Sequence, residues 1–368
     1  MNELQEQVVD VIEGLVASGA ENGVQATVYR HGELIVDAVA GVADHRTGRP
    51  VTSDTLFYAA STVKGVTSTV VHVLVEQGVL SYDTLVASAW PEFGAHGKES
   101  TTVRQVLTHS AGIPAVPADL TLSRFCDWDA MCSLIASLEP WWVPGSRVGY
   151  HAVTFGFILG EVVRRATGSP ISTVLASVVG EPLGIENELY FGVPASELGR
   201  VAHFEDDPAG AAMFASLPPD FPLFKSGPRS LFPNAALANN AAVTMADIPA
   251  WGTATARSLA RMYAALLTDV DGVRLVSPAR LQKISSLSTT GNDEMTGGPA
   301  QYALGYTVGQ VGMRPVAPTV FGMVGIGGSA AYADTATGIS VAVTKNRFNP
   351  TEINAFEQVW DLAAKAFS

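Results

Sequence analysis

The chain has 368 residues, of which 47% are hydrophobic, and this content predicts a globular protein with either two domains or one domain carrying a sizeable insertion. Charged residues make up only 15% and the net charge is −13, so the sequence lacks the basic surface of proteins that bind nucleic acids or anionic membranes. A small neutral molecule is the better expectation for a substrate.

The N-terminal residues, from Met1 to Glu6, carry acidic side chains where a secretion signal would carry basic ones, and no apolar stretch reaches the length of a membrane span. We therefore expect a cytoplasmic protein that does not associate with membranes. Cys126 and Cys132 are the only cysteines and lie apart from any histidine pattern, so they predict neither a zinc site nor a disulfide framework. No metal or other cofactor is expected.

The first elements predict a helix that covers a sheet. Residues 3–18 have an apolar stripe at helical spacing, and the runs 23–30 and 33–40 are strand-like and joined by a short turn, as in a β-hairpin. A further short strand, residues 56–60, leads into the next apolar run.

That run, from Ser61 to Gln77, is rich in valine, which favours strands, but it is too long for an ordinary strand. Its apolar residues follow the helical period, and Gly78 is a typical residue for a helix end. In a helix, residues three apart share a face, so the Ser61 hydroxyl would meet the Lys64 ammonium at a helix N-terminus that favours negative charge. A serine beside a base suits acyl transfer, although the spacing alone also fits an ordinary exposed helix start.

From Gly78 onward, prolines separate helical segments, which predicts a mostly helical insertion. Residues 103–109 form a short helix that ends at His109, which is either a core or capping histidine or a general base. Tyr150 stands before the first turn of a helix that ends at Gly168, and local sequence alone would make it a buried tyrosine.

Residues 196–250 are loop-rich and predict a lid or wall over a site. Beyond them the pattern predicts a helix at 255–267, strands at 302–309, 320–324, 330–334 and 338–344, and a final helix at 352–367. The strands of the two chain ends should share one antiparallel sheet. We therefore expect an α/β domain from residues 1–80 and 250–368, with residues 81–249 as the helical insertion.

Four ordered motifs carry a resemblance to a known family: Ser61-Thr62-Val63-Lys64, the run from Leu107 to Gly112, Tyr150 ahead of its helix, and Gly325-Ile326-Gly327-Gly328-Ser329. With them the chain resembles the serine β-lactamase-like hydrolases, and most of all the class C β-lactamase-like carboxylesterases, also called family VIII esterases. The resemblance implies an α+β fold in which helices flank an antiparallel sheet and a helical domain is inserted.

The resemblance also implies roles for individual residues. Ser61 would be the nucleophile, and Lys64 and Tyr150 the pair that takes and returns its proton. The backbone N–H groups of Ser61 and Ser329 would form the oxyanion hole. Gly327 and Gly328 would allow a close approach of the backbone to the substrate.

The sequence departs from the family pattern at two places in the pocket. Lactamases and peptidases of this group usually show Tyr-x-Asn and Lys-Thr-Gly or His-Thr-Gly, but here Ala152 stands for the asparagine and Ile326 for the cation. Esterases of the group also replace the cation with an apolar residue. Trp251-Gly252-Thr253 resembles a family loop at the pocket rim, although an ordinary core tryptophan fits the sequence equally well.

Together these features predict a serine hydrolase that cleaves small carboxylic esters through an acyl-enzyme. The alternatives are an amide, lactam or D-peptide hydrolase, an acyltransferase of the same fold, and a catalytically silent penicillin-binding-like receptor. An α/β-hydrolase is disfavoured because the sequence holds no Gly-x-Ser-x-Gly motif. The sequence leaves the natural substrate and the oligomeric state open.

Overall fold

The computed structural model describes residues 3–218, 220–350 and 352–367. Its largest sheet has seven strands, and every neighbouring pair is antiparallel. In spatial order they are β3 (Arg49–Pro50), β2 (Glu33–Asp44), β1 (Gly23–Arg30), β13 (Ile339–Lys345), β12 (Ala330–Asp334), β11 (Val320–Val324) and β8 (Thr307–Val308). The predicted sheet shared by the two chain ends is therefore confirmed.

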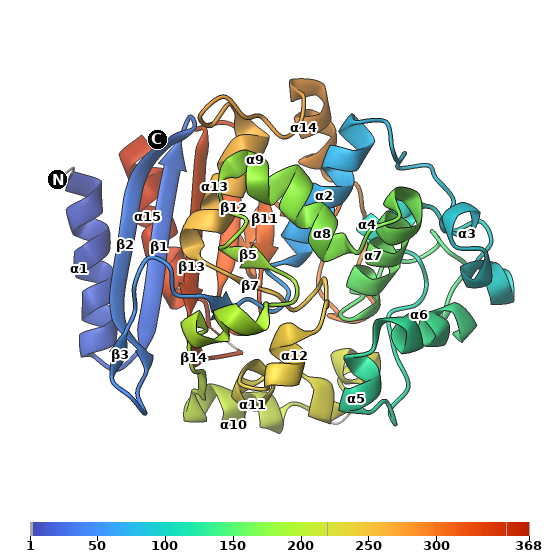
Figure 1. The fold of residues 1–368 in the computed structure, drawn as a ribbon, viewed down its shortest axis with the longest axis horizontal. Helices are drawn as coiled ribbons and strands as arrows, with labels where there is room; N and C mark the ends of the chain where they lie inside the picture. The colour runs from blue at the N-terminus through green and yellow to red at the C-terminus, as the bar shows by residue number, and fades with distance from the viewer. Residues whose placement is uncertain (1–2, 219, 351, 368) are drawn as a thin grey trace.

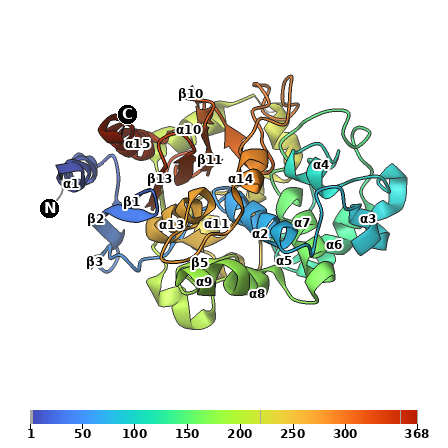
Figure 2. The same cartoon turned by 90° about the horizontal axis from the view of Figure 1, so that it is seen from above.

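Helices cover both faces of this sheet, as Figure 2 shows. The terminal helices α1 (Glu3–Ala17) and α15 (Asn354–Phe367) pack together on one face, and α13 (Ala256–Leu267) packs on the other. Strands β1 and β13 are buried at nearly every position because each face meets a helix layer. This arrangement confirms the predicted α+β class, with an antiparallel sheet flanked by helices.

Helix α2 (Lys64–Glu76) lies between the sheet and a group of further helices (Figure 1). Every residue from Lys64 to Val75 is buried, which explains why the run is apolar on all sides, and Gly78 follows with a φ of +75°. The further helices are α3 (Val86–Ala89), η1 (Pro91–Gly97), α4 (Val103–Leu107), α5 (Leu122–Phe125), α6 (Trp128–Ser137), α7 (Thr154–Thr167), α8 (Ile171–Leu175), η2 (Ala176–Gly180) and α9 (Glu181–Leu183). The domain boundaries at residues 80 and 250 stay a prediction.

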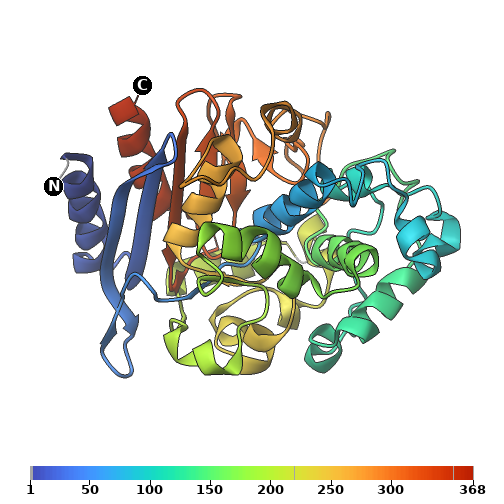
Figure 3. The ribbon, with the colours of Figure 1, turned by 45° about the horizontal axis from the view of Figure 1, so that its top comes forward.

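A segment of short elements runs along the lower side of the molecule, drawn in yellow-green in Figure 3. Its elements are η3 (Ala195–Arg200), β6 (Glu205–Asp206), α10 (Pro208–Ser216), η4 (Pro222–Ser226), η5 (Arg229–Leu231), α11 (Ala235–Ala238) and α12 (Ala241–Met245). Strand β6 pairs with β14 (Arg347–Phe348), and the Asp207 carboxylate binds the Arg347 guanidinium at 2.6 Å. One end of the segment is thereby tied to the end of the large sheet.

Smaller sheets complete the fold. One joins β4 (Phe57–Tyr58), β7 (Thr253–Ala254) and β5 (Leu189–Tyr190), and another joins β9 (Gln310–Val311) and β10 (Arg314–Pro315). Helix α14 (Pro278–Ile284) follows α13. Among the described residues, no helix combines the length and the apolar character that crossing a bilayer requires.

Several predicted elements were wrong in extent, and for two of them a backbone angle gives the reason. The helix predicted from Ser61 begins only at Lys64, because Ser61 has a φ of +64°, outside the right-handed helical region. The strand predicted at 302–309 is reduced to Thr307–Val308, because Gly305 turns the chain with a φ of +85°. The rest of that run is buried, from Tyr302 to Tyr306, outside a regular strand.

Candidate active site

Ser61 stands in the turn that joins β4 to α2. The pairing of β4 with β7 continues beyond both strands, through hydrogen bonds from Ala59 N to Gly252 O (2.8 Å) and from Ser61 N to Ala250 O (2.7 Å). The positive φ of Ser61 then reverses the chain into the helix. A residue with a side chain pays about 1–3 kcal/mol for such a conformation, and strained residues of this kind concentrate at functional sites.

Lys64 meets Ser61 although the two do not share a helix. The Lys64 Nζ lies 3.0 Å from the Ser61 Oγ, and the lysine side chain is completely buried. Burial lowers the pKa of Lys64 to about 7, because the charged ammonium loses its hydration. A substantial fraction of the amine is therefore neutral near neutral pH and can accept the serine proton.

Tyr150 lies beside the same pair of residues. Its ring faces the Lys64 Nζ, which is 4.9 Å from the ring centroid. Burial raises the pKa of the Tyr150 hydroxyl, while a hydrogen bond with the Ser61 side chain opposes that rise. The hydroxyl thus keeps its proton at neutral pH, which suits it to donate or relay a proton rather than to act as the resting base.

His109 is buried and packs against Tyr150. Its buried ring stacks on Phe155 and tilts against Tyr150, with both centroids at 4.8 Å, and its Nδ1 accepts the His151 backbone N–H at 3.1 Å. Burial, followed by the nearby His151 and Lys64, holds the pKa of His109 well below its usual value. A neutral ring that packs on Tyr150 fits the structural alternative for His109 better than a role as general base.

Tyr302 and Asp293 also border this cluster, although no sequence motif pointed to either residue. The Tyr302 hydroxyl donates to the Asp293 carboxylate at 2.9 Å, and its ring lies 4.8 Å from that of His109. The charge of Asp293 also contributes to the raised pKa of Tyr150. Both residues come from irregular chain far from Tyr150 in sequence, so no local motif could have identified them.

The predicted oxyanion role of the Ser61 N–H conflicts with the structure. That N–H already donates to the Ala250 carbonyl at 2.7 Å, because the β4–β7 register extends to it. A donor in an existing hydrogen bond is not preorganised for an oxyanion. Ser329 is held close to the site, since its carbonyl accepts from Thr62 Oγ1 and from Gly325 N, both at 2.8 Å, and its own N–H remains the predicted donor.

One cavity of about 820 Å³ opens from Ser61 and Tyr150. Of the predicted pocket residues, Ile326, Trp251 and Ala152 line it. The structure places the other two, Gly327 and Gly328, elsewhere: a Cβ on Gly327 would strike the Phe348 ring, and one on Gly328 would strike the Lys345 side chain. These glycines therefore permit close packing of the chain behind the cavity wall.

Trp251 fits both alternatives that the sequence left open. It is buried, and its ring lies 4.5 Å from Phe125 and 6.5 Å from Tyr58, yet it also borders the cavity. The predicted lid or wall is also in place, since several residues between Phe214 and Pro233 line the same cavity.

Known proteins are similar to this chain in sequence and in fold. The Beta-lactamase family matches residues 8–364. The esterase/beta-lactamase LipL of Mycobacterium tuberculosis is 33% identical over 335 residues, which cover 87% of this chain and 76% of LipL. A solved family VIII carboxylesterase is 31% identical with a TM-score of 0.88, covering 99% of this chain and 98% of that one. A penicillin-binding protein homologue from Caulobacter crescentus is 32% identical with a TM-score of 0.84, covering 100% and 98%.

These matches confirm the resemblance that the motifs indicated. The family match extends over nearly the whole chain, and the solved relatives share its fold from end to end. The protein belongs to the beta-lactamase family.

Proposed function

We propose that this protein is a serine carboxylesterase that cleaves small esters through an acyl-enzyme on Ser61. The observation that carries the proposal is the 3.0 Å contact between the Lys64 Nζ and the Ser61 Oγ, at a site where burial brings the pKa of Lys64 to about 7. The names of the relatives, an esterase/beta-lactamase and a family VIII carboxylesterase, support the same activity.

In this mechanism the neutral Lys64 amine takes the proton of the Ser61 hydroxyl while Oγ forms a bond to the acyl carbon. The carbonyl oxygen becomes an oxyanion, for which the Ser329 N–H is the proposed donor. When the ester C–O bond breaks, the leaving alkoxide receives a proton through Tyr150, and Lys64 returns one to Tyr150. Water then attacks the acyl carbon and gives a proton to the same pair. When the bond between the acyl carbon and the Ser61 Oγ breaks, the pair returns that proton to Oγ, and the acid leaves.

Two other functions remain as alternatives. An amide, lactam or D-peptide hydrolase, or an acyltransferase, would use the same Ser61, Lys64 and Tyr150, and the name of the penicillin-binding protein homologue fits the peptide branch. We favour esters because Ile326 and Ala152 offer neither a cation nor an amide to a substrate. A receptor that binds its ligand without covalent chemistry would not require a buried lysine base beside Ser61. The cytoplasmic location stays a prediction.

Active-site titration tests the proposal. Mixed with a p-nitrophenyl ester, the protein should release a burst of p-nitrophenol equal to one per chain or less, followed by steady turnover. A receptor that only becomes acylated would give the burst without turnover. Absence of both burst and turnover with p-nitrophenyl esters, in a folded sample, would contradict the proposal.

The pH dependence of ester hydrolysis should report on Lys64. The neutral amine is the active form, so kcat/KM should rise with pH and level off above the Lys64 pKa of about 7. Below that pKa the neutral fraction falls tenfold per pH unit, which leaves roughly one hundredth of the plateau at about pH 5. Stopped-flow or plate assays from acid to mild alkali, corrected for spontaneous hydrolysis, would measure this.

Tyr150→Phe provides the control for that profile. Because the pKa of Tyr150 is raised and its hydroxyl stays protonated, the variant should be slower at every pH yet keep the same acid limb. An acid limb that disappears in Tyr150→Phe would assign the base to Tyr150 instead of Lys64. A wild-type profile that is flat down to about pH 5 would mean that Lys64 does not titrate as the structure indicates.

A further inference from the structure

One wall of the cavity is built on a cluster of four phenylalanines, Phe214, Phe221, Phe224 and Phe232, which we call the phenylalanine cluster. Ring centroids lie 5.3 Å apart for Phe214 and Phe224, 5.5 Å for Phe224 and Phe232, and 5.8 Å for Phe221 and Phe224. Edge-to-face pairs of this kind add about 0.5–1.5 kcal/mol each beyond simple burial. The cluster therefore gives the wall its own small apolar core.

The chain that carries this cluster is apolar well beyond it. No charged residue occurs between Asp207 and Asp220, and in α10 the Met213 side chain is 58% exposed. Ordinary surface helices carry polar residues on their outer face, so an apolar run at this position calls for a reason. Within this run, Phe214 and Leu217 line the cavity, and contact with an apolar part of a substrate gives a reason for these two side chains.

The cavity connects this wall with the reactive serine. Its lining includes Ser61 and Tyr150, together with apolar side chains from the wall, namely Phe214, Leu217, Leu223, Leu231 and Phe232. The charged residues that border it include Arg314 and Glu357, and Asp361 binds Arg314 through both carboxylate oxygens. A cavity of about 820 Å³ exceeds what an acetyl or methyl group next to Ser61 can fill.

We propose that the site accepts esters with one extended apolar arm, which lies along the wall formed by Phe214, Leu217 and Phe232. The inference rests on the proposed esterase function and adds the class of substrate. Each methylene that is removed from water contributes up to about 0.8 kcal/mol, which corresponds to about fourfold in kcat/KM. The specificity should therefore rise with arm length until the wall is covered.

Two ester series measure this rise. The first is p-nitrophenyl acetate, butyrate, hexanoate and octanoate, and the second is methyl, butyl, hexyl and octyl acetate followed by acid release. In one series kcat/KM should increase by about fourfold to tenfold per added pair of methylenes. A rise in either series supports the proposal and tells which arm contacts the wall, whereas a flat or falling profile in both would overturn it.

Two variants tie the effect to the wall. Phe232→Ala and Phe214→Ala should each lower the ratio of kcat/KM for the long ester to that for the acetate by about tenfold, because the arm loses its contact surface. Both side chains are only partly buried, and Phe214 lies on the exposed helix α10, so either can be truncated without emptying the main core. If Phe232→Ala has a markedly lower melting temperature than the wild-type protein, the test relies on Phe214→Ala alone.

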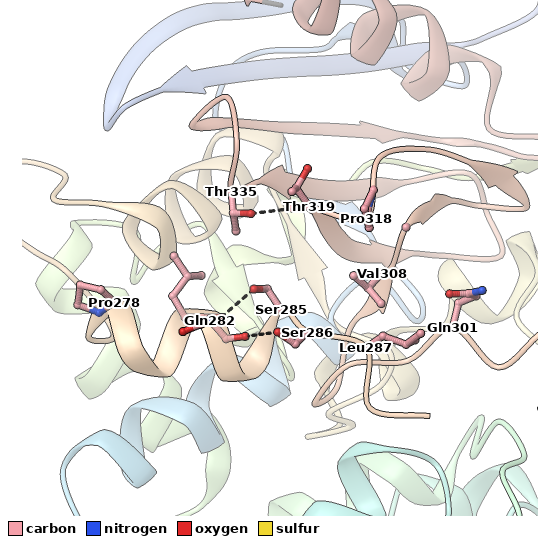
Figure 4. A pocket seen from close by; sticks show the side chains of 12 residues that line it. Pro278, Gln282, Ser285, Ser286, Leu287, Gln301, Val308, Pro318, Thr319 and Thr335 are labelled. Atoms are coloured by element: carbon pink, nitrogen blue, oxygen red, sulfur yellow. Dashed lines mark hydrogen bonds between the residues drawn. The ribbon is translucent and has the colours of Figure 1, made fainter. Parts of the chain in front are cut away.

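Leu287→Ala is the matched control. Leu287 is 52% exposed and lines a separate groove of about 450 Å³, shown in Figure 4, whose described lining residues are uncharged. In Leu287→Ala, the ratio of kcat/KM for the long ester to that for the acetate should stay within about twofold of the wild-type value. An equal loss in Leu287→Ala would overturn the assignment to the wall. Failure to hydrolyse any ester would refute the esterase function, whereas acetate turnover without length dependence would refute only this inference.

Discussion

Ser61→Ala should lower kcat/KM for p-nitrophenyl butyrate by at least about 10⁴-fold and abolish labelling by a fluorophosphonate. The Ser61 Oγ is the atom proposed to bond to the acyl carbon, and it lies 3.0 Å from the Lys64 Nζ that would take its proton. Without it, the remaining groups can only polarise the ester toward attack by water. Initial rates and gel-based detection of the fluorophosphonate adduct would measure both losses.

The fold should survive this substitution, because alanine at a φ of +64° carries about the same backbone strain as serine. Unchanged far-ultraviolet circular dichroism and melting temperature would establish that. Ser286→Ala is the matched control, since Ser286 is exposed and its hydroxyl bonds only to the Gln282 carbonyl among the contacts described. Fluorophosphonate labelling that persists in Ser61→Ala would exclude Ser61 as the nucleophile.

Local patterns predicted most of the elements. The strand 23–30 and the helices near 3–17 and 256–267 were predicted to within a residue, because their burial follows a single period and their ends carry ordinary stop signals. The meeting of Ser61 and Lys64 was predicted through a shared helical face, yet the structure achieves it with a left-handed serine ahead of the helix. Sequence spacing predicted the pair, whereas its geometry depends on the left-handed turn at Ser61.

Features that depend on contacts between residues far apart in the sequence could not be predicted. The Ser61 N–H is occupied because Ala250 lies opposite it in a small sheet, and the partners of that sheet are fixed by tertiary packing. Asp293 and Tyr302 reach the site from an irregular region that has no periodic pattern. The burial that lowers the pKa of Lys64 is likewise a property of the assembled helices around α2.

Two cations near the cavity, Lys345 and Arg314, are already paired with carboxylates, and this bears on the choice of substrate. Lys345 lies behind Gly328 and binds Glu21 in a buried ion pair, while Arg314 is held by Asp361 at 2.7 and 2.9 Å. Ile326 lines the cavity where related lactamases and peptidases carry a cation. A β-lactam would therefore bring its carboxylate to a wall that offers no matched positive charge among these residues.

We accordingly expect kcat/KM for a short p-nitrophenyl ester to exceed that for nitrocefin by about 10⁴-fold or more. An unpaired carboxylate in a desolvated site costs several kcal/mol, and Ala152 leaves the acylamino group of a lactam with an unmade hydrogen bond worth roughly 1–3 kcal/mol. The two free-energy penalties add, and each 1.4 kcal/mol lowers kcat/KM for nitrocefin by about tenfold. Neither penalty applies to a neutral ester. Parallel steady-state assays of the two chromogenic substrates would measure the ratio.

Ile326→Lys tests this argument directly, because it places an ammonium group beside the expected position of the substrate carboxylate. Relative to the volume-matched control Ile326→Met, it should shift the ratio toward nitrocefin by about tenfold or more, since a charge-assisted hydrogen bond contributes roughly 1.5–3 kcal/mol. Equal efficiency of the wild-type protein on the ester and on nitrocefin would contradict the prediction. Another residue would then have to supply the missing charge, and the preference for esters would lose its physical basis.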